Sequence, residues 1–184
     1  MISPWERVLG DDGDRLAPAL QRYFAAIAPG DVGRGHGVFT TVGTPRRWLW
    51  PVLWLLARDG VVFPVWDRDV PFSVENRSTP AGTVRATRTF HRAHGDLVMV
   101  DEVGVTASGL VDRLGRHGRV SARLTATVVD GRLELRSTGV TVRLGRVRVP
   151  LGMLSPRVTL VERTEGDHQH VSLVLDAPLI GRLY

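Results

Sequence analysis

From about residue 61 to the end, the chain is a succession of strand-like segments separated by turn signals. Alternating or β-branched patterns occur near 69–77, 83–92, 97–106, 119–129, 132–144, 146–151, 157–164 and 169–176. The turn signals are His94-Gly95, Asp130-Gly131 and Gly166-Asp167. Strands at such regular spacing, with no helix between them, predict an antiparallel meander that closes into a barrel or nearly does. This pattern disfavours a Rossmann-type nucleotide fold, which alternates strands and helices.

The first 60 residues differ from the rest, because their patterns favour helix. Apolar residues recur at helical spacing from Leu16 to Ile27, and a second helix is predicted from about Pro45 to Arg58, after a short strand over 35–43. We therefore predict one mainly β domain over 1–184, with a minor α component. Its helical cap (1–60) contributes one or two helices that close one end of an antiparallel, barrel-like sheet (61–184).

The composition excludes several classes of chemistry. The chain has 184 residues, no cysteine and no lysine, so disulfides, thiolate nucleophiles and Schiff-base lysines are ruled out. The net charge of +5 comes from arginines spread along the chain without any nucleic-acid motif, and we expect no nucleic-acid partner. The most apolar run, Trp48–Ala57, is much shorter than the ~20 residues that span a bilayer. With no targeting segment visible, we expect a cytoplasmic protein without a membrane span.

The turn at His94-Gly95 places two charged side chains on an apolar face. With a two-residue turn, Arg88 lies opposite Asp101, and Phe90 lies opposite Met99. Side chains alternate along a strand with period two, so these four share one face. Because the rest of that face is apolar, we expect it to point inward.

The other two turns are interpreted in the same way. Asp130-Gly131 gives an apolar face and a polar face, as in a half-buried antiparallel sheet. Gly166-Asp167 places Glu162 opposite Val171 on an apolar face. A buried charge costs several kcal/mol unless it is paired. Either Arg88, Asp101 and Glu162 pair with one another, or they line a cavity that holds water or a ligand.

Short phrases along nearly the whole chain resemble one bacterial family. They are Trp5–Gly10, Arg88–Phe90, Val100–Gly104, Val147–Leu151, Leu154–Val158, Glu162 and Ala177–Tyr184. The family is called domain of unknown function 4166, and its domain occurs alone or behind a reductase resembling saccharopine dehydrogenase. The resemblance implies no activity and assigns no role to the matching positions, which include Glu102. The chain departs from the family at Arg85-Ala86-Thr87, where a tryptophan is common.

Two further groups of side chains are candidates for function. His168 and His170 lie on one strand face, but without a third ligand they favour a solvated hairpin, and we expect no metal. Tryptophans surround the second predicted helix at positions 48, 50, 54 and 66. They are either ordinary core residues or a lid at the mouth of the barrel, with Arg46 and Arg47 at its entrance.

These observations favour binding of a hydrophobic small molecule inside the sheet, without a cofactor. The protein is then either a carrier or a cofactor-independent cyclase or isomerase of secondary metabolism. In the enzyme, Asp101 or Glu162 serves as acid or base and Arg88 stabilises an oxyanion; in the carrier, Arg88 anchors a ligand carboxylate or carbonyl. The predicted ligand-binding residues are Phe90, Met99, Trp50, Trp54, Trp66 and Glu102. A third alternative is an interaction domain that supports a separate reductase, which predicts a filled core and an exposed apolar patch.

Overall fold

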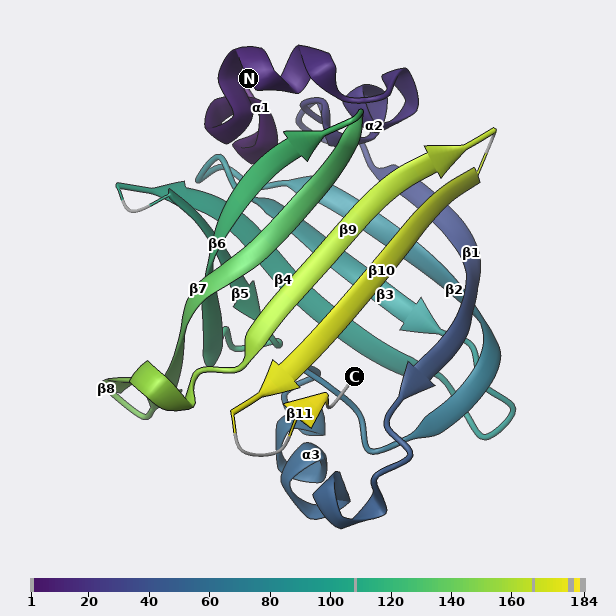
Figure 1. Ribbon diagram of the computed structural model, residues 1–184, viewed down its shortest axis with the longest axis vertical. Helices are drawn as coiled ribbons and strands as arrows, with labels where there is room; N and C mark the ends of the chain where they lie inside the picture. The colour runs from purple at the N-terminus through teal and green to yellow at the C-terminus, as the bar shows by residue number, and fades with distance from the viewer. Residues whose placement is uncertain (1, 108, 167, 179–180, 183–184) are drawn as a thin grey trace.

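The computed structural model describes residues 2–107, 109–166, 168–178 and 181–182. An antiparallel sheet curls into a half-barrel, as the sequence predicts (Figure 1). The strands are β1 (Gly33–Gly43), β2 (Trp66–Ser78), β3 (Val84–Phe90), β4 (Leu97–Thr106), β5 (Gly109–Leu114), β6 (Val120–Val129), β7 (Arg132–Leu144), β8 (Val147–Pro150), β9 (Arg157–Glu165), β10 (His168–Ala177) and β11 (Gly181–Arg182). They pair in chain order from β1 to β11, except that β8 pairs with β7 beside the main path.

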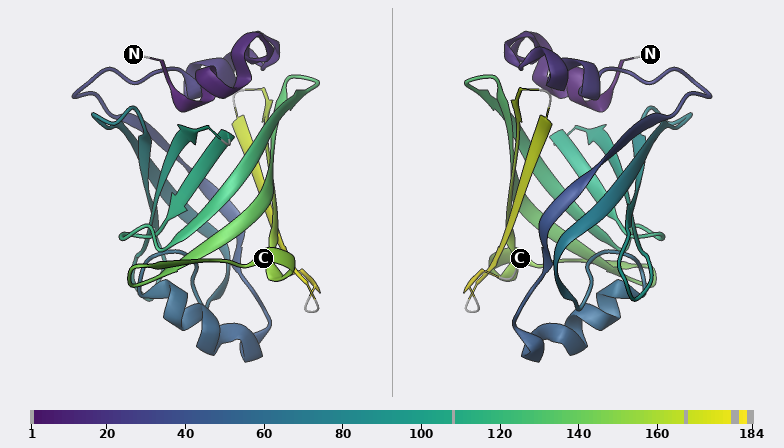
Figure 2. Two further views of the ribbon diagram at one scale, coloured as in Figure 1. Left: turned by 90° about the vertical axis from the view of Figure 1, so that its left-hand side faces the viewer. Right: turned by 90° about the vertical axis from the view of Figure 1, so that its right-hand side faces the viewer.

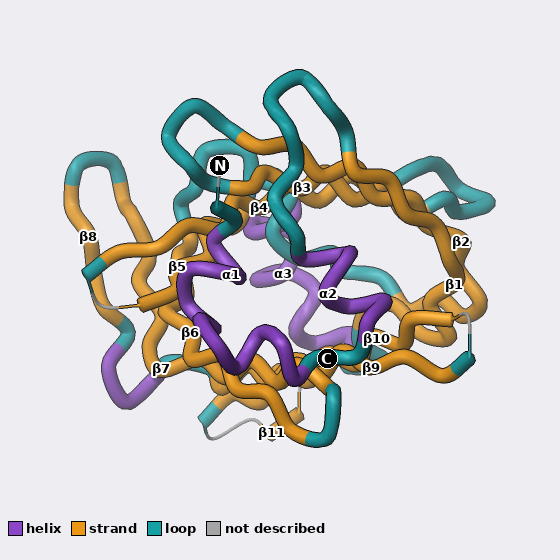
Figure 3. The backbone as a smooth tube through the Cα atoms, turned by 90° about the horizontal axis from the view of Figure 1, so that it is seen from above, coloured by secondary structure: helices purple, strands orange, loops and turns teal. Residues whose placement is uncertain are grey.

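The helices lie at the two ends of the curled sheet (Figure 2). They are α1 (Pro4–Leu9), α2 (Pro18–Phe24) and α3 (Trp50–Ala57), with short 3-10 segments η1 (Gly10–Arg15), η2 (Arg47–Leu49) and η3 (Gly152–Leu154). Seen from above, α1 and α2 cross one end of the sheet (Figure 3). Helix α3 lies at the opposite end, so the two helical regions do not close the same end.

Two separate apolar clusters fill the two ends of the interior. At the α1–α2 end, Leu16, Leu20 and Phe24 pack with Leu110 and Leu133 of the sheet. The opposite end contains a second set of buried residues, namely Val42, Phe63, Val65, Val70 and Phe90. The middle of the interior lies between these clusters, and the charged side chains lie there.

Two of the three predicted hairpin registers are confirmed. Val128 pairs with Leu133 across the turn at 130–131, where both turn residues have positive φ, as a two-residue hairpin requires. In the next hairpin, Val171 pairs with Glu162 as predicted.

The predicted register at His94-Gly95 is wrong by two residues. The loop spans 91–96, and its tight turn is closed by Gly95 N donating to Arg92 O at 3.1 Å. Arg88 therefore pairs with Met99, and Asp101 pairs with Ala86. A shift of two leaves every side chain on its predicted face, because alternation has period two. Arg88 and Asp101 still share the inward face, as diagonal neighbours.

The capping of α1 fixes the N-terminal segment. Ser3 accepts a hydrogen bond from Glu6 N, and the Glu6 side chain accepts one from Ser3 N, which together form a capping box. The Ser3 hydroxyl also donates to Phe24 O at 2.7 Å, so it links α1 to the end of α2.

We expect Ser3→Ala to lower the free energy of unfolding by about 1–2 kcal/mol, because it removes the cap and leaves Phe24 O without this donor. Urea denaturation measures the loss. Asp12→Ala, which alters only an exposed ion pair with Arg15, is the matched control and should change stability by less than about 0.5 kcal/mol. Equal stability of Ser3→Ala and wild type would contradict this assignment.

Candidate functional site

The middle of the interior contains one guanidinium and three carboxyl groups. Arg88 donates from Nη1 to Asp101 Oδ1 in an ion pair. The Asp101 side chain is 3% exposed, while Arg88 keeps 30% of its side-chain surface accessible. The predicted association of these two residues is therefore confirmed. Arg88 provides the buried Asp101 carboxylate with a hydrogen-bond donor and an opposite charge, while part of the Arg88 side chain remains accessible to solvent.

Asp112 is a third member of the site that sequence reasoning missed. It lies on β5, opposite Val103 of β4 and Ala122 of β6, so it shares the inward face. Its Oδ1 is buried and has no hydrogen-bond partner among the described residues. Burial raises the pKa of Asp112 to about 6, and the positive charge of Arg88 opposes that rise.

Glu162 reaches the same layer from β9. It lies opposite Leu133 of β7 and Val171 of β10, and it is buried. The Gln169 amide donates to Glu162 Oε2 at 2.5 Å. Burial raises the pKa of Glu162 to about 7, against the opposing effects of the Gln169 hydrogen bond and the Arg88 charge. The carboxyl is therefore poised to exchange a proton near neutral pH, as the sequence-based hypothesis requires.

The interior wall beside Glu162 is apolar and remains open to solvent. Val171 and Leu173 share the face of Glu162 and pack toward the interior, yet each is 39% exposed. They belong to β10, near one end of the sheet path; β1 forms the other end, and the described residues form no ladder between these two strands. Solvent therefore reaches the interior on this side, directly beside the buried Glu162 carboxyl.

Two of the predicted ligand-binding residues belong to the cluster near α3. Phe90 is buried there against Phe63 and Phe39, with ring centroids 6.2 and 5.5 Å away. Met99 packs against the same cluster. Met99 also lies directly opposite Arg88, so this apolar cluster adjoins the ion pair.

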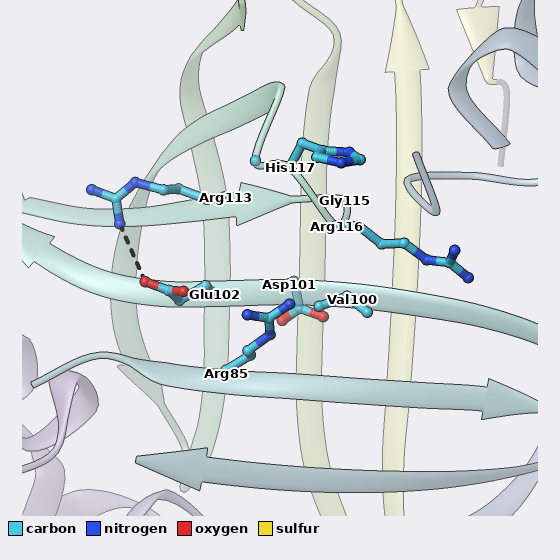
Figure 4. A pocket seen from close by; sticks show the side chains of 9 residues that line it. Arg85, Val100, Asp101, Glu102, Arg113, Gly115, Arg116 and His117 are labelled. Carbon is cyan, nitrogen blue, oxygen red and sulfur yellow. Dashed lines mark ion pairs between the residues drawn. The ribbon is translucent and has the colours of Figure 1, made fainter. Parts of the chain in front are cut away.

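Glu102 lies on the opposite face of the sheet. Its Oε1 accepts a hydrogen bond from Thr83 at 3.0 Å and lies 4.0 Å from Arg113 Nη1. Glu102 and Arg113, together with Arg85 and the turn that carries His117, line an outer depression of about 220 Å³ (Figure 4). Glu102 thus faces away from the interior, and its part in ligand binding stays a prediction. The depression holds cross-strand charge pairs on a solvated face, which contribute little to stability.

The predicted tryptophans do not line the interior site either. Trp50 and Trp54 border a depression of about 410 Å³ on the surface around α3, together with Arg47, Pro51 and Pro64. Trp50 Nε1 donates to Thr44 O at 3.3 Å, and Trp54 lies under the Arg58 guanidinium at 3.8 Å. Trp66 at the start of β2 is also exposed. Their predicted contact with a ligand in the interior is therefore not supported.

The histidine pair of β10 faces away from the interior. Gln169, which lies between the two histidines, points inward to Glu162, so His168 and His170 occupy the outer face. His170 Nε2 lies 3.5 Å from Glu165 Oε2. Across the described ranges, no group of three or more histidine, aspartate or glutamate side chains is arranged to hold a metal ion.

The arrangement can carry acid–base chemistry. Arg88 compensates Asp101 directly and acts on Asp112 and Glu162 through its charge alone. Three carboxyl groups face one guanidinium, so the site has more groups that can accept a proton than one cation can compensate. Groups with separated pKa values near neutrality can serve as acid and base in one reaction.

Comparison with known proteins identifies a family and no function. Searches of curated proteins and of solved structures find no match. A family model matches residues 16–184, nearly the whole chain, and this range includes Arg88, Asp101, Asp112 and Glu162. The chain therefore belongs to the family described as Domain of unknown function (DUF4166).

Proposed function

We propose that this protein binds a small molecule with an apolar body in the interior of the curled sheet and isomerises or cyclises it by proton transfer, without a cofactor. The observation that carries the proposal is the position of Glu162. Its buried carboxyl adjoins the apolar side chains of Val171 and Leu173, which face the interior and remain accessible. An apolar wall beside a few convergent polar groups is typical of small-molecule sites.

The charges favour a neutral polar group on the ligand over a carboxylate. Arg88 is already engaged by Asp101, and Asp112 and Glu162 add two acidic groups around it. A ligand carboxylate would be repelled by these neighbours once they ionise. A carbonyl, by contrast, accepts a hydrogen bond from a protonated carboxyl. We therefore expect a ketone or enone within an apolar skeleton.

The roles follow from the surroundings of each carboxyl. Protonated Glu162, held by Gln169, donates to the carbonyl oxygen. Asp112, whose Oδ1 has no partner among the described residues, accepts a proton from the adjacent carbon. Arg88 stabilises negative charge that develops on the oxygen. The Asp101 carboxylate holds Arg88 in place and takes no proton, which revises its predicted role as an acid or base.

The competing proposal is a carrier that binds the same molecule without changing it. It needs the apolar wall and Arg88, but it does not need carboxyls that exchange protons near neutral pH. Substitution of Glu162 therefore separates the enzyme from the carrier.

Hydrogen exchange into the ligand tests the proposal. The molecule retained by the purified wild-type protein is released by denaturation and incubated in D₂O with fresh protein. We expect wild type to introduce deuterium next to the carbonyl, and Glu162→Gln and Asp112→Asn each to slow this at least 100-fold, the usual range for loss of a general acid or base.

Glu165→Gln, which changes an exposed carboxyl on the same strand, should leave exchange unchanged. If wild type binds the molecule but introduces no deuterium, the protein is a carrier and the enzymatic proposal fails.

A further inference from the structure

The surface around α3 exposes an unusual amount of apolar side chain. Trp48, Trp54, Leu55 and Trp66 are between 41% and 64% exposed. Helix α3 contains no polar residue, so it cannot turn a hydrophilic face to water. We call Trp48, Trp54, Leu55 and Trp66 the tryptophan surface. Its Trp54 also lines the 410 Å³ depression described above.

A second exposed apolar segment lies at the same end of the molecule. Val147 of β8, and Met153 and Leu154 of η3, are 62%, 95% and 65% exposed. Figures 1 and 2 show β8 and η3 at the end that carries α3. Near this end, Arg143 of β7 donates to His117 O at 2.7 Å, and His117 Nδ1 lies 2.5 Å from Asp59 Oδ1, just after α3.

This end of the protein is also strongly basic. The segments 44–58 and 143–157 contain seven arginines and no acidic residue. Of the acidic residues that follow α3, Asp59 is buried with its Oδ1 beside His117 Nδ1, and Asp67 forms an ion pair with Arg92. Asp69 is exposed, but it adjoins the exposed Arg68. Exposed apolar side chains and arginines therefore occur together at one end of the protein.

We propose that this end of the protein docks on the surface of an anionic lipid bilayer. Tryptophan rings prefer the headgroup region, where their apolar body and polar N–H are both accommodated. Arginines around them attract anionic headgroups while their stems cover apolar surface. None of the described helices has the length and apolar character to cross a bilayer, so the contact is peripheral.

Charge complementarity selects the bilayer over a second copy of this chain. A symmetric dimer would bring the arginines of segments 44–58 and 143–157 against their own copies, and like charges at a desolvated contact are unfavourable. The headgroups of an anionic membrane instead carry the charge opposite to that of these arginines. The proposal does not depend on a ligand in the interior, because the tryptophan surface lies outside the Arg88 site.

Vesicle sedimentation tests the proposal. We expect wild type to bind vesicles of phosphatidylcholine with 30 mol% phosphatidylglycerol at low salt, and to bind pure phosphatidylcholine at least tenfold more weakly. Trp54→Ser/Leu55→Ser should weaken binding to the anionic vesicles at least tenfold. Arg146→Gln/Arg148→Gln should weaken it by a similar factor, since one arginine near such a surface contributes about fivefold.

Two variants at the opposite end are matched controls. Val129→Ser changes an exposed apolar residue beside the β6–β7 turn, and Arg22→Gln changes an exposed arginine of α2. Both should bind like wild type. Tryptophan quenching by brominated lipid adds a positional readout: Trp5→Phe, at the α1 end, should retain the quenching, and Trp48→Phe/Trp54→Phe/Trp66→Phe should lose more than half of it.

Three outcomes would overturn the proposal. The first is equal binding of wild type to anionic and neutral vesicles, or to neither. The second is unchanged binding by Trp54→Ser/Leu55→Ser in a protein that melts like wild type. The third is a wild-type dimer that this double substitution converts to monomer, because the surface would then be an interface between copies.

Discussion

Replacing Arg88 with methionine should lower the free energy of unfolding by about 3–5 kcal/mol at pH 8, as measured by urea denaturation. Asp101 is 3% exposed, and Arg88 is its ion-pair partner. Without that partner, an uncompensated carboxylate remains buried, which is the costly way to break an ion pair. Arg88 also stabilises the charged forms of Asp112 and Glu162, so its loss affects all three carboxyls.

The pH dependence identifies the cause of that loss. Protonation neutralises the carboxyls, so the difference between Arg88→Met and wild type should shrink as pH falls toward 4. The matched control is Arg88→Met/Asp101→Leu, which removes both charges and should recover most of the lost stability, since apolar replacement of a buried ion pair is often neutral. A loss below about 1 kcal/mol in the single variant, or no recovery in the double variant, would show that Asp101 does not depend on Arg88.

Replacing Glu162 with glutamine should have the opposite effect to Arg88→Met at high pH, because it should raise the free energy of unfolding relative to wild type. Burial raises the pKa of Glu162 from the ordinary 4.5 to about 7, so between these values the folded protein binds more proton than the unfolded chain. The stability of wild type therefore falls as pH rises through this window and stays lower above it. Glutamine stays neutral and avoids the penalty. We expect Glu162→Gln to gain up to about 3 kcal/mol over wild type on going from pH 4 to pH 8.

Denaturant titrations at pH 4, 6 and 8 measure this gain. Glu165→Gln, three residues beyond Glu162 on the same strand and paired with Arg163, should follow wild type at every pH. Asp112→Asn should show a gain of the same sign, centred about one pH unit lower, because its pKa is raised to about 6. Parallel pH profiles for wild type and Glu162→Gln would mean that Glu162 is solvated in the folded protein.

The sheet could be predicted from the sequence because apolar and polar residues alternate along its strands and because short turn sequences mark where the strands end. The two-residue turn at 130–131 and the pairing of Glu165 with His168 fix the registers, and the pairs Val128–Leu133 and Glu162–Val171 follow from them. The turn near residue 94 was misplaced because His94-Gly95 resembles a two-residue hairpin, whereas Gly95 closes a turn that begins at Arg92. The predicted and the observed registers differ by two residues, so the same side chains face inward in both.

Other elements gave weaker signals. Strand β5 spans only Gly109–Leu114 and places Asp112 and Arg113 side by side, so neither alternation nor an apolar run marks it. Helix α1 has only six residues, and its capping box at Ser3 and Glu6 was the signal that could have identified it. The position of α3 at the far end depends on packing of residues 57–65 against β1, β2 and β3, which local patterns do not contain.

The candidate site was predicted in part. Arg88, Asp101 and Glu162 were identified because charged residues at inward positions violate an apolar pattern. Asp112 is likewise a charged residue at an inward position, because it shares one face of β5 with Leu110 and Leu114. This is visible only once β5 is recognised as a strand. Glu102 lies between Asp101 and Val103, so alternation along β4 by itself places it on the outer face.

Native mass spectrometry of the purified protein, with Leu173→Trp as the comparison, tests the central claim that the interior holds a small molecule. Leu173 lies on the accessible inner wall of β10, and an indole there would occupy the space beside Glu162. We predict that wild type carries a non-covalent apolar molecule, or is stabilised thermally by members of a panel of lipids and polyketides, and that Leu173→Trp shows neither. A bare mass in both proteins, with no thermal shift across the panel, would contradict the claim.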